Sequence, residues 1–418
     1  MARKEEIIVG LDVGTHKVVA IVGEVKSDGG IDIIGVGSSA SNGIRKGVVV
    51  NVNETMEAIQ RAVHEAELMA GCTVNAVYVS VSGKDLKSFN NRGVVAVQNR
   101  EVTETDVQRV LENAKAVQIP ADRTILHTVP QEFLVDDNDG IRYPIGISGV
   151  RLQVNVHIIT ALNSGVQNVV QCAERAGLHV LKSSAEMLAS GRAVLEDDEK
   201  ELGVVLVDIG GGTTDIAIYH NGFVVHSAVL PVGGDHITND IAVGLRTPKA
   251  EAERIKIQHG CALSTMVTDD ENIEVACVGG REPIVRKRKL LCDIVEPRME
   301  EIYRLIEREI QASNFADVLG SGVVITGGTA LLPGCAELGE DVLGLPVRVG
   351  YPRQVGGLRD MINSPVFSTA LGLVLQGGDD ENETAKDAGR TRRASAKAAK
   401  TAGNGISARI KGWLSEVF

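Results

Sequence analysis

Two glycine-rich segments place aspartates and hydroxyl groups where a phosphate could bind. The first is GLDVGT at 10–15, and the second is VDIGGGTTD at 207–215. Glycine lets a backbone N–H turn toward a phosphate because no Cβ stands in the way. Hydroxyl and ammonium groups next to the glycines can supply further donors. We therefore predict two phosphate-binding loops, formed by Gly14, Thr15, His16, Lys17, Gly210, Gly211, Gly212, Thr213 and Thr214.

Three carboxylates accompany these loops: Asp12 in the first, and Asp208 and Asp215 in the second. Carboxylates suit a hard cation such as Mg²⁺, which keeps several of its waters when it binds a protein. Such a cation would neutralise the charge of a bound phosphate. The sequence therefore predicts a phosphate ligand with Mg²⁺, held by the three aspartates through water.

The residues that follow the loops narrow the alternatives. A single glycine-rich turn is more often a plain hairpin than a binding site. A Rossmann site needs a helix directly after its loop, whereas KVVAIVGEV and DIAIYHNG follow here with the apolar character of strands. Neither loop has the Gly-Lys-Ser/Thr ending of a P-loop. The loops lie about 200 residues apart, so we predict two related domains that grip one phosphate tail between them.

Apolar periodicity predicts the elements that position these loops. Short β-branched runs around both loops are typical of strands. Residues 54–70 show the apolar spacing of a helix. Residues 84–160 differ, because a helix at 103–117, capped by Thr103, lies among strands with polar connections. This segment is expected to be an inserted α+β module.

The end of the chain has a different character. Residues 377–404 hold no large apolar side chain, which predicts a flexible linker. Residues 405–418, placed on a helix, gather an apolar stripe flanked by basic side chains. This helix could dock on the protein's own core or lie in the plane of a membrane, and the long polar linker favours the membrane. The residues of the predicted anchor are Ile406, Arg409, Ile410, Lys411, Trp413, Leu414, Val417 and Phe418.

The strength of such an anchor suggests how it would be used. Partly burying about five or six apolar side chains contributes about 5–8 kcal/mol before ordering costs. One copy would bind reversibly, while several copies joined in a polymer would bind far more tightly through avidity. We therefore expect polymerisation and membrane attachment to reinforce each other.

Composition argues against several classes of protein. The 418 residues are 44% hydrophobic and 23% charged, as is typical of a soluble globular chain. A net charge of −12 disfavours nucleic acid as a partner, because a phosphate backbone needs a basic surface. The six cysteines show neither a zinc pattern nor a disulfide framework. We expect a cytoplasmic protein without a signal peptide or a membrane-spanning segment.

The order of these motifs resembles the actin/Hsp70/sugar-kinase superfamily. GLDVGTHKV resembles its first phosphate motif, VDIGGGTTDIAI its second and VVITGGTALLPG its adenosine motif. AERIKIQHG at 252–260 resembles the segment that contacts adenine and ribose in bacterial actins. Within the superfamily, the module at 84–160, the HGCALS and IVEPR stretches and the amphipathic end resemble the FtsA family of bacterial cell-division proteins.

The resemblance implies a fold and a ligand. The fold would be α/β, an actin-like two-lobed ATPase fold of ribonuclease H-like repeats, with an inserted α+β subdomain, a flexible linker and a C-terminal amphipathic helix. The ligand would be ATP with Mg²⁺, and the resemblance adds Gly233, Gly234, Glu253, Lys256, Gly327 and Gly328 to its contacts.

The resemblance assigns no catalytic residue. Glu186 falls at the start of the first connecting helix, where an acidic residue stands in Hsp70-like relatives. A proline follows that residue in those relatives, but Met187 follows here. Glu186 is therefore only a candidate for positioning a hydrolytic water, and we expect at most a slow ATPase.

The subdomain boundaries expected from the family pattern cover the whole chain. Subdomain 1A takes 1–83, 161–195 and 346–376, subdomain 1C takes 84–160, subdomain 2A takes 196–234 and 301–345, subdomain 2B takes 235–300, the linker takes 377–404 and the membrane-targeting helix takes 405–418.

The resemblance also implies partners. Subdomain 2B would receive the C-terminal tail of FtsZ, the tubulin-like division protein, near Arg286 and Arg298. Subdomain 1C would bind later division proteins, and copies of the chain would form filaments. The C-terminal helix would bind anionic lipid on the cytoplasmic face of the inner membrane, at the division septum.

Two alternatives belong to other functional classes. A sugar or acid kinase could use the same fold, but it would have no reason to carry a lipid-binding end. An Hsp70-like chaperone would need a substrate-binding β domain after the nucleotide-binding part, and the sequence shows none.

Overall fold

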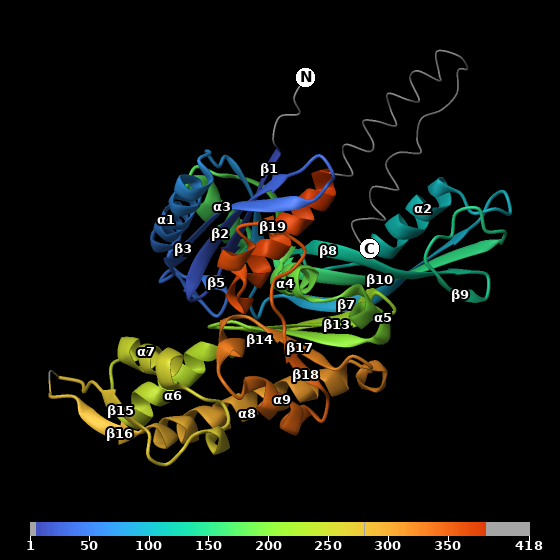
Figure 1. Ribbon diagram of the computed structural model, residues 1–418. Helices are drawn as coiled ribbons and strands as arrows, with labels where there is room; N and C mark the ends of the chain where they lie inside the picture. The colour runs from blue at the N-terminus through green and yellow to red at the C-terminus, as the bar shows by residue number, and fades with distance from the viewer. Residues whose placement is uncertain (1–5, 280, 382–418) are drawn as a thin grey trace.

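The computed structural model of this chain describes residues 6–279 and 281–381. Two large β-sheets, with helices on and between them, form two lobes, and a smaller sheet extends to one side (Figure 1). The predicted linker and C-terminal amphipathic helix lie outside the described residues, apart from the linker's first few residues. Among the described residues, no helix is both long and apolar enough to cross a membrane.

The strands are β1 Glu6–Val13, β2 Lys17–Val25, β3 Ile31–Ala40, β4 Ile44–Arg45, β5 Val48–Val49, β6 Ala76–Val81, β7 Lys87–Ala96, β8 Arg123–Val135, β9 Asn138–Ile141, β10 Arg151–Leu162, β11 His179–Ala185, β12 Val204–Ile209, β13 Thr214–His220, β14 Phe223–Leu230, β15 Asn272–Val275, β16 Ile284–Lys287, β17 Val323–Thr326, β18 Val347–Val349 and β19 Gly356–Gly357. The helices are α1 Val52–Ala70, α2 Glu104–Lys115, α3 Asn163–Arg175, α4 Glu186–Val194, α5 Asp197–Leu202, α6 Gly234–Leu245, α7 Lys249–His259, α8 Arg288–Ala312 and α9 Cys335–Leu343, with 3₁₀ turns η1 Ser264–Met266, η2 Ala316–Val318, η3 Gly328–Leu331, η4 Arg359–Ile362 and η5 Pro365–Phe367. A further helix spans 368–381.

The two large sheets have the same topology. In the first lobe the order is β11-β6-β1-β2-β3-β19, with β1, β2 and β3 antiparallel and β6 and β11 parallel to β1. In the second lobe β14, β13 and β12 are antiparallel, and β17 and β18 continue parallel to β12. This repetition confirms the prediction of two related domains.

The alternation of side chains along the strands builds a layered molecule. Val18 and Ala20 of β2 pack under α1 and α3, whereas Val19 and Ile21 point to the opposite face. On that face, α4 and the helix over 368–381 form a core that both large sheets share. Helices α6 to α9 cover the far face of the second sheet. Packed helices therefore lie on both faces of the second sheet and on both faces of the first, and they hold the strands that carry the glycine-rich turns.

The segment between β6 and α3 forms a module of its own. Its sheet has the order β7-β10-β8-β9, and α2 packs on one face of it around a separate apolar core. Thr103 and Asp106 form a reciprocal capping box at the start of α2, as Thr103 predicted. An inserted α+β module is therefore present in the fold, as predicted.

This inserted module also contacts the edge strand of the second lobe. Ser88, Asn90 and Gln131 donate hydrogen bonds to three main-chain carbonyls of β14, at 2.6, 3.0 and 2.8 Å. His157 Nε2 lies 2.8 Å from the hydroxyl of Ser227 in β14, and His157 Nδ1 lies 2.7 Å from the amide oxygen of Asn90. Side chains of the module thus occupy acceptors that an edge strand otherwise exposes. We call this contact the polar seam.

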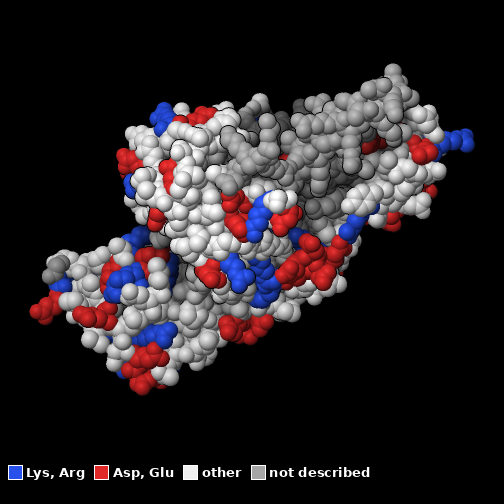
Figure 2. Space-filling view, turned by 45° about the horizontal axis from the view of Figure 1, so that its top comes forward, with Lys and Arg blue, Asp and Glu red and all other residues white. Residues whose placement is uncertain are grey.

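Acidic and basic side chains are interspersed on the described part of the face in Figure 2. No continuous basic surface is visible on that part of the face. This distribution agrees with the net charge of −12 and offers no track for a phosphate backbone there.

Candidate functional site

A pocket of about 370 Å³ lies between the two lobes, within the size range of small-molecule sites. Residues from both glycine-rich turns, from α4, α6 and α7 and from the turn after β17 line it. The predicted residues among the lining are Asp12, Gly14, Thr15, His16, Lys17, Glu186, Asp208, Gly210, Gly211, Thr213, Gly234, Glu253, Lys256, Gly327 and Gly328.

Both glycine-rich turns have the same hydrogen-bond pattern. Gly14 N donates to Lys17 O at 3.0 Å, and Gly210 N donates to Thr213 O at 3.0 Å. Each turn follows the first strand of an antiparallel hairpin, β1–β2 in one lobe and β12–β13 in the other. The repeated sequence motif therefore produces two matching hairpins that face one pocket from opposite lobes.

Two glycines are required by close approaches at this pocket. A Cβ on Gly212 would lie 2.7 Å from Thr15 Oγ1 and 2.9 Å from Lys46 Cα, both in the opposite lobe. Gly327 has a φ of +85°, and its Cβ would lie 2.4 Å from Asp208 Oδ1. A side chain at either position would push apart segments that the pocket needs close together.

The floor of the pocket carries buried carboxylates. Ser80 donates a hydrogen bond to Asp12 Oδ1 at 2.7 Å, and Thr369 donates one to Asp208 Oδ2 at 3.2 Å. Burial raises the pKa of Asp12 to about 6, against the hydrogen bond from Ser80. Burial and the charge of Asp12 raise the pKa of Asp208 to about 7. The two lobes thus bring Asp12 and Asp208 together, without enough nearby positive charge to offset the repulsion between their carboxylates.

A third aspartate and a glutamate add to this negative charge. The hydroxyl of Ser82 in the first lobe lies 3.0 and 2.9 Å from the two carboxylate oxygens of Asp215 in the second lobe, and its single proton is shared between them. Burial and the charge of Asp208 raise the pKa of Asp215 to about 8. Burial and the charge of Asp215 raise the pKa of Glu186 well above its usual value. A cation at this position would remove the repulsion among these groups.

We next consider whether these buried carboxylates suit Mg²⁺. Among the described residues, no three His, Cys, Asp or Glu side chains are placed to hold a metal directly. Mg²⁺ commonly keeps several waters and takes only one or two carboxylates, with substrate phosphates as further ligands. The arrangement therefore suits a hydrated cation that a phosphate ligand completes, in line with the predicted coordination through water.

Lys17 supplies positive charge beside this floor. Burial lowers its pKa, against the opposing effect of Asp12. Its Nζ lies 5.4 Å from the centre of the Phe367 ring, within the range of a cation–π contact. Lys17 lies in the first hairpin and lines the pocket, where an anion could approach its ammonium group.

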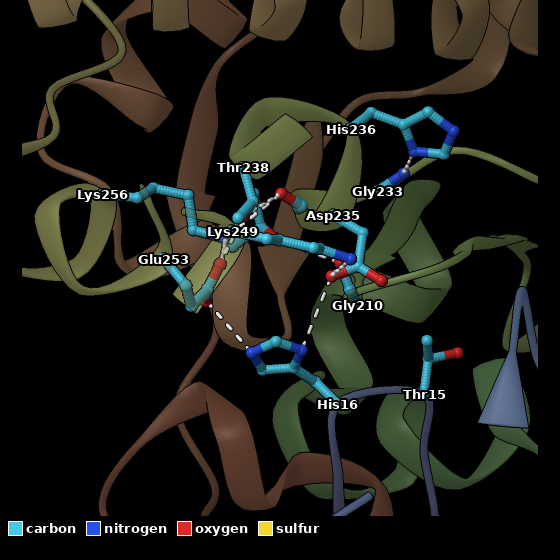
Figure 3. Close-up of polar contacts among 12 residues, drawn as sticks. Thr15, His16, Gly210, Gly233, Asp235, His236, Thr238, Lys249, Glu253 and Lys256 are labelled. Carbon is cyan, nitrogen blue, oxygen red and sulfur yellow. Dashed lines mark hydrogen bonds and ion pairs between the residues drawn. The ribbon is translucent and has the colours of Figure 1, made fainter. Parts of the chain in front are cut away.

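The opposite wall comes from α6 and α7 of the second lobe (Figure 3). Lys256 Nζ lies 2.8 Å from Glu253 Oε2 and donates to Gly234 O at 3.1 Å. Burial opposes the charge of Glu253, but a hydrogen bond from His16 and the charge of Lys256 hold its pKa down to about 2. Two residues predicted from different segments of the chain, Glu253 and His16, therefore meet directly.

Apolar side chains form another part of the pocket. Ile257 of α7 and Leu331 of η3 line it, and their exposed fractions are 71% and 47%. Large apolar side chains left this open within a concave pocket are suited to cover a flat apolar ring. The pocket thus combines an acidic floor, a lysine and an apolar wall.

Four predicted residues are not on the pocket surface: Gly212, Thr214, Asp215 and Gly233. Thr214 donates its hydroxyl to Val232 O at 2.8 Å and so supports its own lobe. Gly233 packs against the carbonyls of the second hairpin, where its Cβ would lie 2.7 Å from Gly210 O. Asp215 acts through Ser82, which does line the pocket.

Sequence reasoning missed the hydroxyls that hold the aspartates. Ser80 and Ser82 lie at and just after the end of β6, and Thr369 is the second residue of the helix over 368–381. The period-two spacing of the serines in YVSVSG at 78–83 places them on one face of a strand, and this signal was available. Nothing local marked Thr369, whose partner lies 161 positions away.

The two arginines expected to receive a partner differ in their surroundings. Arg286 is exposed in β16, on a small hairpin of the second lobe. Arg298 is paired within the chain: its Nε lies 2.6 Å from Asp240 Oδ2, and it also contacts Glu301. The predicted membrane residues 406–418 lie outside the described residues.

Comparison with known sequences finds one family along the chain. Residues 205–372 match the family described as Cell division protein FtsA, and residues 83–160 match the SHS2 domain inserted in FTSA. The chain is 47% identical to Cell division protein FtsA of Pseudomonas aeruginosa over 372 residues, or 89% of each chain. It is 43% identical to the Neisseria meningitidis protein of the same name over 424 residues, the full length of both. These relatives are division proteins, so the kinase alternative receives no support from them.

Comparison with solved structures shows the fold. A chain of a PilM-PilN type IV pilus biogenesis complex matches with a TM-score of 0.64 at 18% identity, over 89% of this chain and 98% of that one. MreB5 of Spiroplasma citri bound to ADP matches with a TM-score of 0.53 at 14% identity, over 88% of this chain and 94% of that one. Both agree with the predicted actin-like, two-lobed architecture.

Proposed function

The chain belongs to the FtsA family of cell division proteins, and from this premise we propose that it binds ATP with Mg²⁺ between its two lobes. One observation carries the proposal: matching hairpins from both lobes converge on buried carboxylates that lack enough positive charge. A hydrated Mg²⁺ beside Asp12, Asp208 and Asp215 would supply that charge and attract a polyphosphate. The apolar wall of Ile257 and Leu331 suits the adenine ring.

Calorimetric titration of the full chain with ATP tests this proposal. Binding should require Mg²⁺ and should weaken at least tenfold in Asp208→Asn, because the cation loses a carboxylate. Asp341→Asn, an exposed acid on α9, makes the same charge change outside the pocket and should leave binding unchanged. Equal affinity with and without Mg²⁺ would refute the acidic floor as a cation site.

ATP in this pocket serves assembly more than chemistry on a substrate. Glu186 is the candidate for positioning a hydrolytic water. Burial and the surrounding carboxylates raise its pKa well above the usual range. Slow turnover is expected, and single-turnover assays of wild type and Glu186→Gln should differ by less than tenfold if Glu186 only positions water.

Filament formation and membrane attachment belong to the same proposal. The stretch 405–418, outside the described residues, has the apolar stripe and basic flanks of an in-plane anchor. The chain would then form filaments on the cytoplasmic side of the inner membrane, at the septum. Pelleting with anionic vesicles should retain the full chain, lose a 1–404 truncation and lose Trp413→Glu. Equal pelleting of all three would refute the anchor.

Division partners complete the proposal. Subdomain 2B, residues 235–300, would bind the C-terminal tail of FtsZ, and subdomain 1C, residues 84–160, would bind later division proteins. Arg286→Glu is the cleaner test of the first contact, because Arg298→Glu would also break the pair with Asp240. A FtsZ tail peptide that binds Arg286→Glu as well as wild type would remove this arginine from the interface.

A further inference from the structure

One side chain of the first hairpin crosses the pocket to both helices of the opposite wall. His16 Nε2 lies 3.1 Å from Glu253 Oε1 on α7, and His16 Nδ1 lies 3.5 Å from Asp235 Oδ1 on α6. Figure 3 shows the ring below the two carboxylates, with a dashed line to each. This side chain was expected to approach phosphate, but its nearest partners are acids of the second lobe.

The two contacts of His16 differ in kind. A neutral imidazole has one N–H, whereas the imidazolium donates from both nitrogens. Both partners of His16 are carboxylate oxygens, which accept but do not donate when ionised. The contact with Glu253 is a hydrogen bond that the ring donates, whereas the contact with Asp235 is a 3.5 Å approach without a hydrogen bond.

Each of the two acids has one carboxylate oxygen for which His16 is the nearest partner. Asp235 Oδ1 is buried without a hydrogen bond, and besides His16 its nearest cation is Lys249 Nζ at 3.9 Å. Glu253 Oε2 is already taken by Lys256 and Thr238, so His16 serves the remaining oxygen. A hydrogen bond from His16 and the charge of Lys256 hold the pKa of Glu253 down to about 2, so this acid is ionised at neutral pH.

We propose that His16 is a cross-cleft latch: its imidazole ring ties the first hairpin to α6 and α7 and slows the passage of nucleotide into and out of the pocket. The proposal rests on the proposed nucleotide site and adds a means of regulating its exchange. The ring is half exposed, with an exposed side-chain fraction of 51%, so solvent screens its contacts in part and each one is weak enough to open.

A latch has a kinetic signature that a ligand contact lacks. Opening must come before both entry and exit of nucleotide, so removing the latch raises the association and dissociation rate constants by a similar factor. The dissociation constant then changes little. A residue that instead touches bound phosphate changes the dissociation rate constant and the affinity together.

Stopped-flow kinetics with a fluorescent ATP analogue and Mg²⁺ test the latch on the full chain. His16→Ala should raise both rate constants about fivefold, the scale of a partly exposed ion pair. His16→Arg keeps a donor that faces both carboxylates and should keep slow exchange. His64→Ala, an exposed histidine of α1, is the matched control and should behave as wild type.

Two results would overturn the latch. Unchanged rate constants in His16→Ala would do so, and so would a loss of affinity through faster dissociation alone, which would place the ring on bound phosphate.

A second measurement separates failure of the latch from failure of the nucleotide site. Fluorescent labels at exposed Leu68 of α1 and Val285 of β16 report the distance between the lobes without nucleotide. His16→Ala should lengthen or broaden that distance at pH 6, and an identical distribution would overturn the latch even if ATP binding proved absent.

Discussion

Protonation of His157 in the polar seam should weaken the folded protein below neutral pH. The ring is 1% exposed, and burial, with a smaller effect from His226, lowers its pKa from 6.5 to about 3. Asn90 already donates to a β14 carbonyl, so its amide oxygen accepts from His157 Nδ1, and His157 Nε2 accepts from the hydroxyl of Ser227. The neutral ring is therefore the form that fits the seam.

The sign and size of the effect follow from the two pKa values. Between pH 3 and 6.5 the unfolded chain binds a proton at this histidine and the folded chain does not, so the free energy of unfolding falls as pH falls. The full contribution is present above pH 6.5. At pH 5.5 the free energy of unfolding is lower by about 1.4 kcal/mol. In the unfolded chain about ten histidine rings are protonated for each neutral one at this pH, whereas the folded ring stays neutral.

Urea unfolding at pH 8 and pH 5.5 measures this contribution as a difference between variants. His157→Gln keeps an amide donor and acceptor at the seam but cannot titrate. Its loss of stability between the two pH values should be smaller than that of wild type by about 1.4 kcal/mol. His64→Gln, an exposed histidine, should match wild type. An equal pH dependence in wild type and His157→Gln would refute the buried, neutral assignment of His157.

Further predictions concern the pocket. In Mg²⁺-free buffer, Asp215→Asn should lose less stability than wild type between pH 6.5 and pH 8.5. The folded Asp215 carboxyl keeps its proton to about pH 8 and the unfolded one does not, so only wild type loses this contribution as pH rises. An equal loss in both proteins, measured by calorimetry, would contradict the raised pKa of Asp215. Ser82→Ala should weaken Mg²⁺-dependent ATP binding by about 1–3 kcal/mol, since Asp215 loses the hydrogen bond that this hydroxyl donates, and an unchanged titration would rule out that role. Gly212→Val should weaken ATP binding at least tenfold by forcing Thr15 away, whereas Gly165→Val, where a Cβ meets open space, should bind normally; equal binding would show that the hairpins need no close approach.

The sequence predicted the features that depend on local backbone chemistry. Glycines in GLDVGT and VDIGGGTTD signalled tight turns, and the β-branched runs on either side signalled strands, because both preferences act within a few residues. The capping residue Thr103 predicted the start of α2 for the same reason. The resemblance of the ordered motifs then supplied the two-lobed fold.

Local signals could not predict side-chain partners that lie far apart in the chain. Ser82 and Asp215 are 133 positions apart, and their contact exists only because β6 and β13 belong to two lobes that pack around one shared core. Thr214 looked like a phosphate donor in its motif, yet the strand register turns its hydroxyl to Val232. Neither outcome can be read from residue type or spacing.

The sequence by itself determined that two aspartate-bearing hairpins exist and that each can turn a backbone toward phosphate. Tertiary structure alone decided what the hairpins meet: carboxylates crowded at the junction of two lobes, and His16 paired with α6 and α7. The reason is physical. Backbone conformation depends on interactions within a few residues, whereas charge repulsion, burial and cross-lobe pairing depend on how whole sheets pack around the shared core.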